Sequence, residues 1–424
     1  MRRLVILVAV LLLVMGCTAD GDDGTADATS DETTAPGDGT TEPAETTEAP
    51  EETTPVTEPA AEPVAVETED ELYAVPDPLP EGEHGDLVRY QEIVPSGIDG
   101  ARAYRVMYLS ESLAGAPIVV TGTVVVPTAE APAEGRTVLT IAHGTTGIAD
   151  ECAPSKGGGG AELLIAGPAV ERGWIVAITD YEGLGTPGRH PYLVGESEGR
   201  GVIDAVLAAG QLPDAARSDT TLIGGYSQGG HGALWANEVT AEWAPDLDVV
   251  GTFAGAPATE LDVILAAAGT PGVSGFAAMI VAGFEAAYPE ADPAAILTDE
   301  GVAALGAVDE GCTGDVFGAL AGVDLVSPDG PSAEPWPELA RDNNPGQVVT
   351  DDPILIIHSA QDDVVPVALS EILFDRMCGL GQVAERRVLP DGGGHGEAAV
   401  VAYPQALEWF DLLLAGETVE NTCP

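Results

Sequence analysis

The sequence predicts an α/β fold: a mostly parallel β-sheet covered by helices, with a helical cap inserted late in the chain. Short β-branched runs alternate with segments of helical pattern, which is typical of a parallel sheet covered on both faces. The runs are continuously apolar, as expected for strands buried on both sides. One long interval breaks the alternation, and it predicts the cap.

Two extended runs come first, at 101–108 and 117–126. The strands of the alternating part are expected at 137–142, 174–179, 221–225, 249–254, 353–358 and 385–389. Helices are expected at 161–172, 196–211, 229–243, 366–379 and 397–415. The β-branched content of the first set and the helical pattern of the second support these assignments.

The interval from about 256 to 350 is rich in Ala, Gly, Val and Leu and has no clear strand. A structureless loop of that length is uncommon inside a compact domain. Two apolar stretches, Leu261–Ala268 and Ser274–Ala287, are typical of short helices. We expect a helical cap over the carboxyl edge of the sheet, with a separate small domain without a role at the site as the alternative.

The first 17 residues form a predicted lipoprotein signal peptide. Two arginines precede an apolar stretch, Leu4–Val14, that is short for a membrane span and suited to a signal peptide. The stretch ends in VMGC, which resembles a bacterial lipobox, so we expect lipidation of Cys17. The protein would then be exported and anchored to the cell membrane on the extracellular side. Cleavage after Ala19 would instead give a freely secreted protein.

Residues 18–72 are a predicted disordered linker of Thr, Glu, Asp, Pro and Ala. No apolar periodicity appears there, so no core can form to offset the chain entropy. The segment is expected to act as a flexible tether, or to be a solvated tail without consequence. The folded domain is expected at 73–424.

The chain carries a formal net charge of −55. Residues 18–71 hold 18 acidic and no basic side chains, which leaves 70 − 18 = 52 acidic against 15 − 2 = 13 basic residues in 72–424. The folded domain is therefore acidic in its own right. Nucleic acid is not an expected partner, because its phosphates would be repelled. The composition also suggests an ion-rich habitat.

Ser227 lies in the pentapeptide GYSQG and is the candidate nucleophile. The pentapeptide alone is weak evidence. An apolar strand pattern precedes it and a helical pattern follows it, as in a strand–turn–helix nucleophile elbow. Such a turn is strained and requires small neighbours, which Gly225 and Gly229 supply. The hydroxyl would then stand at a helix N-terminus, where negative charge is stabilised.

A serine nucleophile needs a base, and the chain offers His84, His143, His190, His231, His358 and His395. His395 follows the last expected strand and precedes the last helix. In α/β-hydrolases the base occupies that place, in the chain order Ser, Asp, His. His231 lies inside the helix after Ser227 and is expected to be structural, and His358 is expected to cap a strand end.

The acid is expected after the strand at 353–358, where Asp362 and Asp363 are adjacent. The spacing to the following Val-Pro favours Asp362, which would orient the imidazole and stabilise its charged form. Asp363 is then a solvated neighbour. For the oxyanion hole, the backbone N–H of Gln228 is one expected donor, and that of Thr145 or Thr146 is the other.

The cysteines are Cys17, Cys152, Cys312, Cys378 and Cys423. With lipid on Cys17, four remain. An even number in an exported chain predicts two disulfides, for which three connectivities exist. No CxxC pair occurs, so a zinc cluster is not expected.

Five motifs carry a family resemblance: HGTTGIADECAPS at 143–155, DYEGLGTPGRHPYL at 180–193, GYSQGGHGALWANE at 225–238, AQDDVVP at 360–366 and GGGHGEA at 392–398. In this order they resemble the secretory lipase family, which includes the Candida lipase-A-type enzymes and actinobacterial relatives, over about residues 85–420. The resemblance implies the α/β-hydrolase fold. It also implies a triad of Ser227, Asp362 and His395, and disulfides joining Cys152 to Cys312 and Cys378 to Cys423.

The resemblance further implies a secreted serine esterase or lipase that hydrolyses acyl-glycerol-type esters through an acyl-enzyme on Ser227. No cofactor or metal is expected, and the protein is expected to be a monomer. A cutinase-like polyesterase and an envelope acyltransferase would share this chemistry. An alternative of another class is a catalytically inactive hydrolase fold that serves as a surface binding protein.

Overall fold

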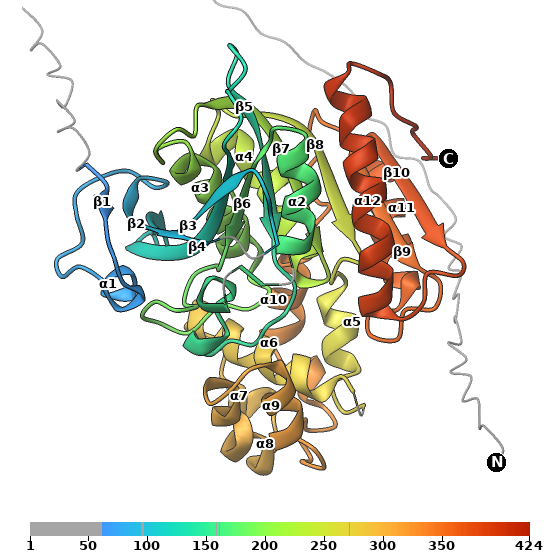
Figure 1. Cartoon of the computed structure of the whole chain (residues 1–424). Coiled ribbons are helices and arrows are strands. Elements are labelled where there is room, and N and C mark those ends of the chain that lie inside the picture. Colours follow the sequence, from blue (N-terminus) through green and yellow to red (C-terminus); the bar gives the residue numbers. More distant parts are fainter. Residues whose placement is uncertain (1–61, 95–96, 158, 161, 271) are drawn as a thin grey trace, which may run out of the picture. The chain divides into compact units, whose positions relative to one another are not determined.

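The computed structural model describes residues 62–94, 97–157, 159–160, 162–270 and 272–424 (Figure 1). The expected signal peptide at 1–17, the lipidation of Cys17 and the linker up to residue 61 lie outside the described residues.

The described strands form one ten-stranded sheet with the order β1-β2-β3-β4-β6-β5-β7-β8-β9-β10. The strands are β1 Val64–Ala65, β2 Leu87–Ile93, β3 Ala101–Glu111, β4 Pro117–Pro127, β5 Arg136–Ala142, β6 Ile175–Thr179, β7 Arg217–Tyr226, β8 Asp248–Gly255, β9 Ile354–Ser359 and β10 Ala384–Leu389. From β6 to β10 every neighbouring pair is parallel, whereas β2, β3, β4 and β6 pair antiparallel. The predicted mostly parallel α/β class is confirmed.

The strand order reverses at β5, which lies between β6 and β7. In open α/β sheets, ligands bind outside the carboxyl ends of the strands at such a switch point, because the loops leave in opposite directions and open a crevice. Here the loops after β5 and β7 carry residues 143–147 and Ser227, respectively. The topology alone therefore brings these two motifs together.

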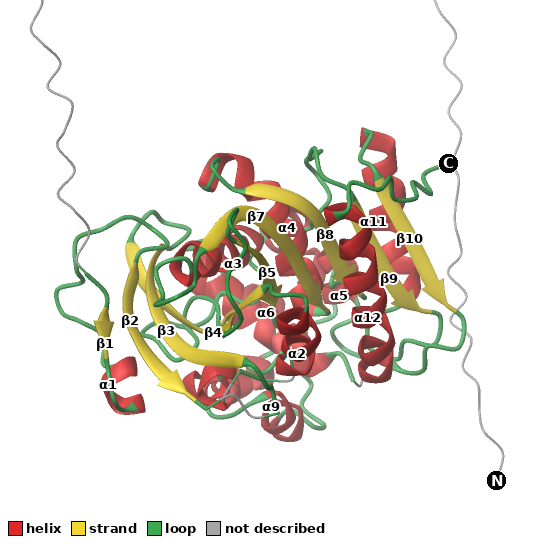
Figure 2. Cartoon of the chain, turned by 45° about the horizontal axis from the view of Figure 1, so that its top comes forward, coloured by secondary structure: helices red, strands yellow, loops and turns green. Residues whose placement is uncertain are grey.

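Helices cover both faces of the sheet (Figure 2). On one face lie α2 Leu163–Glu171 and α12 His395–Leu414. On the other lie α3 Gly195–Ala209, α4 Gln228–Trp243 and α11 Val367–Leu380. Successive residues of β5 alternate between the two layers: Ile141 packs with α2 and α12, and Ala142 with α3 and α4. This double covering is why the strands are apolar at consecutive positions.

Between β8 and β9 the chain forms helices that gather at one edge of the sheet (Figure 1) and share a core with Ile148 and residues 192–194 of the loops after β5 and β6. They are α5 Leu261–Ala266, α6 Ser274–Ala287, α7 Pro293–Ile296, α8 Asp299–Ala304, α9 Thr313–Ala319 and α10 Trp336–Asp342. Short 3₁₀ turns, Leu305–Asp309 and Gly330–Ser332, connect them. We call residues 256–350 the cap.

The linker prediction was too long at its C-terminal end, because residues 62–72 are ordered. β1 pairs with β2, and α1 Glu69–Tyr73 begins at Thr68, whose hydroxyl caps the first turn. Leu72 is fully buried. The few apolar residues of this segment, Val64, Ala65, Val66 and Leu72, show no helical or alternating period, which is why the sequence did not reveal it. The antiparallel strand β2 was also missed.

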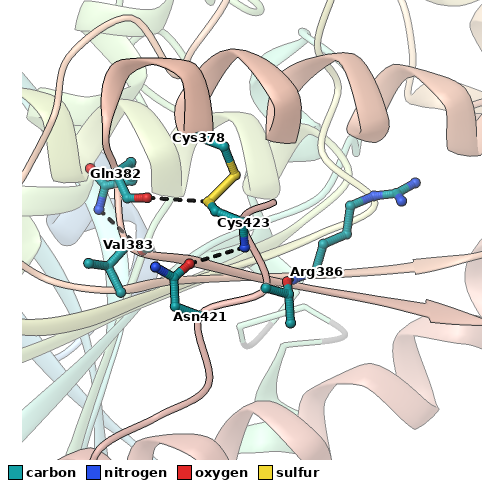
Figure 3. The surroundings of a disulfide bond; sticks show 7 residues. Cys378, Gln382, Val383, Arg386, Asn421 and Cys423 are labelled. Atoms are coloured by element: carbon teal, nitrogen blue, oxygen red, sulfur yellow. Dashed lines mark hydrogen bonds between the residues drawn. A yellow bond between two sulfur atoms is a disulfide. The ribbon is translucent and has the colours of Figure 1, made fainter.

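Two disulfides join Cys152 to Cys312 and Cys378 to Cys423, the pairing that the resemblance implies. The first links the loop after β5 to the start of α9 in the cap. The second ties α11 to the C-terminal segment, where Asn421 also accepts the N–H of Cys423 (Figure 3). In the described part of the chain, every helix is too short or too polar to span a lipid bilayer.

Candidate active site

Ser227 is the residue between β7 and α4, at φ 63° and ψ −121°. This left-handed backbone costs a residue with a side chain about 1–3 kcal/mol and persists only where the surroundings enforce it. The Ser227 N–H donates to the Gly255 carbonyl at 2.9 Å, and its carbonyl accepts from His231 and Ala258. The elbow is therefore fixed by the neighbouring strand β8 and by the first turn of α4.

The glycines beside Ser227 are required by close backbone contacts. A Cβ at Gly225 would lie 1.9 Å from the Gly229 carbonyl oxygen, and a Cβ at Gly229 would lie 2.0 Å from the Ala142 carbonyl oxygen. No side chain fits at either distance. The GYSQG pattern is thus the local sequence that allows β5, β7 and α4 to meet at this turn.

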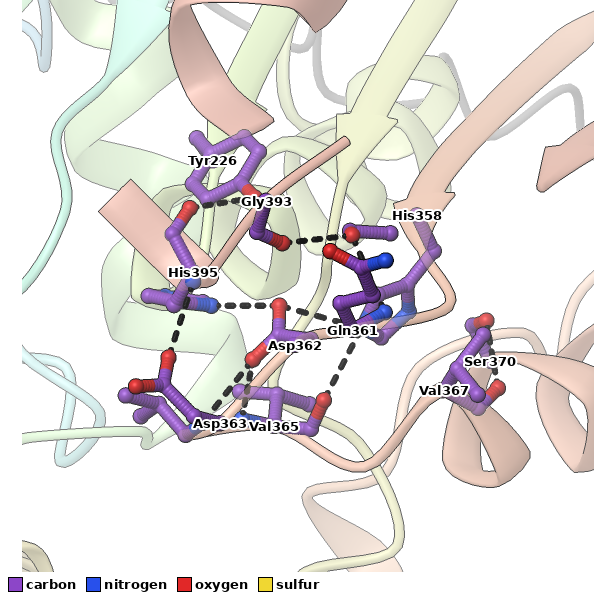
Figure 4. A network of polar contacts seen from close by, with 12 residues as sticks. Tyr226, His358, Gln361, Asp362, Asp363, Val365, Val367, Ser370, Gly393 and His395 are labelled. Atoms are coloured by element: carbon purple, nitrogen blue, oxygen red, sulfur yellow. Dashed lines mark hydrogen bonds and ion pairs between the residues drawn. The ribbon is translucent and has the colours of Figure 1, made fainter. Parts of the chain in front are cut away.

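The His395 Nδ1 lies 2.7 Å from the Asp362 Oδ2, at the start of α12 (Figure 4). Ser227 and His395 line the same cavity. Among the hydrogen bonds of the described residues, none joins the Ser227 hydroxyl to the imidazole. Hydrogen bonds of this kind commonly shorten only when substrate binds. The structure therefore brings together the three residues that the sequence singled out.

The Asp362 carboxylate is fully buried and is surrounded by donors. Its Oδ1 accepts from the N–H groups of Val364 and Val365 at 2.9 and 2.8 Å. Its Oδ2 faces His395 and also the His358 Nε2 at 3.3 Å. Burial alone would raise the pKa of Asp362, but the hydrogen bonds from His358, His395 and Val364 outweigh it, so this pKa lies well below its usual range. The residue is a carboxylate that accepts hydrogen bonds on both oxygens.

Three neighbours of this pair were not assigned these contacts from the sequence (Figure 4). His358 contacts Asp362 and donates to the Val365 carbonyl at 3.0 Å, rather than only capping a strand end. Asp363 is exposed, but its Oδ1 accepts the backbone N–H of His395 at 3.0 Å, so it is more than a solvated neighbour. The Tyr226 hydroxyl donates to the His395 carbonyl at 2.8 Å. The contacts of Asp363 and Tyr226 hold the backbone that carries the imidazole, and His358 supports the carboxylate of Asp362.

The expected oxyanion donors lie on either side of Ser227. Gln228 is the first residue of α4, so its N–H has no partner within the helix. Thr145 and Thr146 line the cavity with Ser227. The Thr145 hydroxyl contacts the Tyr192 hydroxyl at 2.7 Å, whereas the buried Thr146 hydroxyl has no hydrogen-bond partner among the described residues.

A buried polar network lies behind Gln228. Its side-chain amide donates to Glu198 at 2.8 Å and to the His190 Nε2 at 3.0 Å. Burial lowers the pKa of His190 to about 4, so the ring is neutral and accepts this bond. The His231 Nδ1 lies 2.6 Å from Glu198, and its Nε2 donates to the Asn343 carbonyl. His231 is therefore structural in this fold, as its helical position suggested.

A cavity of about 690 Å³ opens beside Ser227 and His395. Its apolar wall comes from α2, α6 and α12: Ile165, Pro168, Phe276, Ala399, Val400 and Leu407. A smaller cavity of about 140 Å³ also reaches Ser227, under α5 and α6, and Phe276 borders both. Ser227 thus faces apolar space on two sides.

The sequence matches the family model described as "Secretory lipase" over residues 158–421. A Mycobacterium tuberculosis protein named "Probable inactive lipase" is 28% identical over 342 residues, covering 75% of each chain. Lipase 9 of Candida albicans is 22% identical over 375 residues, covering 80% of this chain and 81% of the relative.

The structure resembles that of Candida antarctica lipase A in its closed state, with a TM-score of 0.71 and 21% identity over 84% of this chain and 88% of the other. It also resembles the rice cell wall degrading esterase LipA of Xanthomonas oryzae, with a TM-score of 0.65 and 19% identity over 80% of this chain and the whole of the other. These similarities establish the α/β-hydrolase fold. The family match spans more than half of the sequence, and the chain therefore belongs to the secretory lipase family.

Proposed function

We propose that this protein is an exported serine hydrolase that cleaves carboxylic esters of lipid-like character through an acyl-enzyme on Ser227. One observation carries the proposal: a strained serine shares an apolar cavity with a histidine whose Nδ1 is bonded to a buried carboxylate. A serine nucleophile needs a base, and the base needs a group that fixes its tautomer. Ser227, His395 and Asp362 supply these roles in that order.

In the proposed reaction, the His395 Nε2 takes the Ser227 proton while the serine oxygen attacks the ester carbonyl. The developing negative charge is held by the N–H of Gln228 and by that of Thr145 or Thr146. His395 then protonates the leaving alcohol, and water repeats the sequence to release the acid. Asp362 remains ionised throughout and stabilises the imidazolium.

The cavity supports an ester with a sizeable apolar group. Its volume of about 690 Å³ falls within the range of small-molecule sites, about 300–1,000 Å³. Phe276 of the cap and Leu407 of α12 contribute to its wall. Burying such a wall against an acyl chain contributes about 25 cal/mol for each Å² of apolar area removed from water.

The rival is a fold that binds esters or other apolar ligands without turning them over, and a relative named "Probable inactive lipase" gives it weight. The three site residues are all present in this chain. A fluorophosphonate probe decides between the two, because only an activated serine reacts with it. We expect labelling of the wild-type protein and none of Ser227→Ala, which should fold normally and hydrolyse no p-nitrophenyl ester. An unlabelled, inactive wild-type protein would favour the rival.

Export fits the family, and attachment of lipid to Cys17 remains our proposal for how the enzyme is retained at the cell surface. The test is to express the full chain and Cys17→Ala in a bacterial host with labelled fatty acid. The wild-type protein should take up label and partition into detergent, whereas the variant should not. Equal partitioning of both into the aqueous phase would contradict the anchor.

A further inference from the structure

We propose that Thr313 of the cap is a positioning residue for the oxyanion hole, held in place by the Cys152–Cys312 disulfide. The inference rests on the proposed function and assigns part of the cap to the catalytic machinery. Thr313 is the first residue of α9 and lines the cavity together with Ser227, Thr145 and Thr146.

Thr313 binds the oxyanion loop at two consecutive carbonyl groups. Its backbone N–H donates to the Thr146 carbonyl at 3.0 Å, and its hydroxyl lies 3.4 Å from the Thr145 carbonyl. The N–H of a first helical residue has no partner inside the helix, so it is free to make this contact. The stronger bond is the backbone one, and the hydroxyl contact is long for a hydrogen bond.

Because the peptide bond is planar, contacts to these carbonyl groups also fix the direction of the Thr146 N–H group. The carbonyl of Thr145 and the N–H of Thr146 belong to one rigid unit and point in opposite directions. The carbonyl of Thr146 lies on the other side of the same residue. Holding both carbonyls therefore fixes the backbone of Thr146 and the direction of its N–H group, which is one of the two candidate oxyanion donors.

The disulfide keeps Thr313 at this place. Gly147 and Cys312 form an isolated antiparallel bridge, and Cys312 is bonded to Cys152 on the far side of the same loop. The fit is tight: a Cβ at Gly147, where φ is 127°, would lie 2.9 Å from both the Cys152 Sγ and the Cys312 Cα. The start of α9 is thus held against the loop after β5 by a disulfide and a backbone bridge.

The Thr146 side chain gives a second, independent observation. Its hydroxyl is buried and lacks a partner among the described residues, although an unpaired buried hydroxyl costs about 1–3 kcal/mol. The residue borders the cavity. This unsatisfied hydroxyl belongs to a residue in the wall of the cavity that contains Ser227, which supports Thr146 as the residue that Thr313 positions.

The test compares a variant that lacks both contacts with one that lacks only the hydroxyl. Proline is accepted at the first position of a helix, and Cys312 already has the extended backbone, with ψ 177°, that a following proline requires. Thr313→Pro therefore deletes the N–H donor to Thr146, together with the hydroxyl, and leaves α9 able to form. Thr313→Ala removes the hydroxyl and keeps the N–H. Asp299→Pro makes the same change at the first residue of α8 and serves as the matched control.

We expect Thr313→Pro to lower kcat about tenfold or more, part of the 10²–10³ that a whole oxyanion donor contributes. KM should stay within about twofold, and binding of a trifluoromethyl ketone, which mimics the tetrahedral intermediate, should weaken in parallel with kcat. Thr313→Ala should retain most of the rate, and Asp299→Pro should match the wild type. If Thr313→Pro equals Thr313→Ala, the inference is wrong while the proposed function stands. If the wild-type protein has no esterase activity, both the inference and the proposed function are wrong.

The disulfides provide a second arm. Cys152→Ala/Cys312→Ala should lower kcat in the same direction as Thr313→Pro, because the clamp on the loop is released. Cys378→Ala/Cys423→Ala deletes a bridge that lies outside both cavities, so it should change thermal stability but not the kcat of the folded enzyme. Equal losses of kcat in both double variants would mean a general effect of disulfide removal and would overturn the role of this one.

Discussion

The Asp362→Asn substitution tests the site most directly, because it changes only a few atoms in a fixed frame. Each carboxylate oxygen of Asp362 faces two donors: Val364 and Val365 on one side, His395 and His358 on the other. An asparagine must turn its NH₂ group toward one of these pairs. Facing the histidines, it favours the His395 tautomer that carries its proton on Nε2, and that nitrogen can no longer accept the serine proton.

The size of the effect follows from the charged hydrogen bond that the substitution removes. A hydrogen bond from the His395 ring to a charged carboxylate contributes about 1.5–3 kcal/mol, and the correct tautomer adds to it. We expect a total of about 4–5 kcal/mol in the transition state, or a fall of about 10³–10⁴ in kcat. In the general Ser-His-Asp template the same change costs about 10⁴.

The assay is p-nitrophenyl ester hydrolysis at saturating substrate, with Asp363→Asn as the matched control. That neighbour accepts only the backbone N–H of His395, and an amide oxygen can accept it too, so its loss should be a few-fold. The pKa of Asp362 lies well below its usual range, so this carboxylate stays ionised when the assay is run at mildly acidic pH. The assignment would be refuted if the kcat of Asp362→Asn stayed within tenfold of the wild-type value. It would also be refuted if Asp362→Asn and Asp363→Asn lost the same amount of activity.

Further predictions address the elbow, a buried acid and the cavity. Gly225→Ala should destabilise the fold by about 3 kcal/mol or more, because its Cβ meets the Gly229 carbonyl at 1.9 Å, whereas Gly224→Ala meets nothing nearer than 3.6 Å and should be tolerated in thermal melts. Burial raises the pKa of Glu238 from 4.5 to about 7, so its ionisation costs the native state progressively above pH 4.5 and in full above pH 7. The unfolding free energy of Glu238→Gln minus that of the wild type should therefore be about 3 kcal/mol more favourable at pH 8 than at pH 4. A difference that does not change with pH would contradict the raised pKa. Ala399→Trp should fill the large cavity and lower kcat/KM for long-chain esters far more than for p-nitrophenyl acetate; uniform losses would argue against that cavity as the substrate site.

The parts of the site that the sequence predicted are those that follow from local chemistry. Gly225 and Gly229 mark the elbow because no residue with a side chain fits at these two positions. Asp362 and His395 were found because each follows a recognisable strand, and because parallel strands end at the same edge of the sheet. The strands and main helices were predicted for the same reason: each has a pattern of its own.

The rest depends on contacts between distant residues, which leave no local pattern. Thr313 lies in a helix of seven residues, 167 positions after Thr146, and nothing in its own segment indicates that it binds the loop after β5. Tyr226 and Asp363 adjoin residues of interest, yet their bonds to the His395 backbone form only once α12 is packed. β1 has two residues and exists only because β2 is present.

The distribution of unfavourable features bears on whether this chain is active. Ser227 has a strained backbone, the Thr146 hydroxyl is buried without a partner among the described residues, and the Asp362 charge is buried. The first two lower stability by an amount comparable to one or two ordinary core substitutions, whereas the cost of burying the Asp362 charge is offset by the hydrogen bonds that the carboxylate accepts. Features of this kind persist only where the surrounding structure enforces them, and they cluster where a site is preorganised for chemistry. A fold that only bound an apolar ligand would gain nothing from a positive φ at Ser227 or from an ionised Asp362 behind His395. Ser227, Thr146 and the histidine bonded to Asp362 all line one cavity, and this arrangement favours catalysis over passive binding.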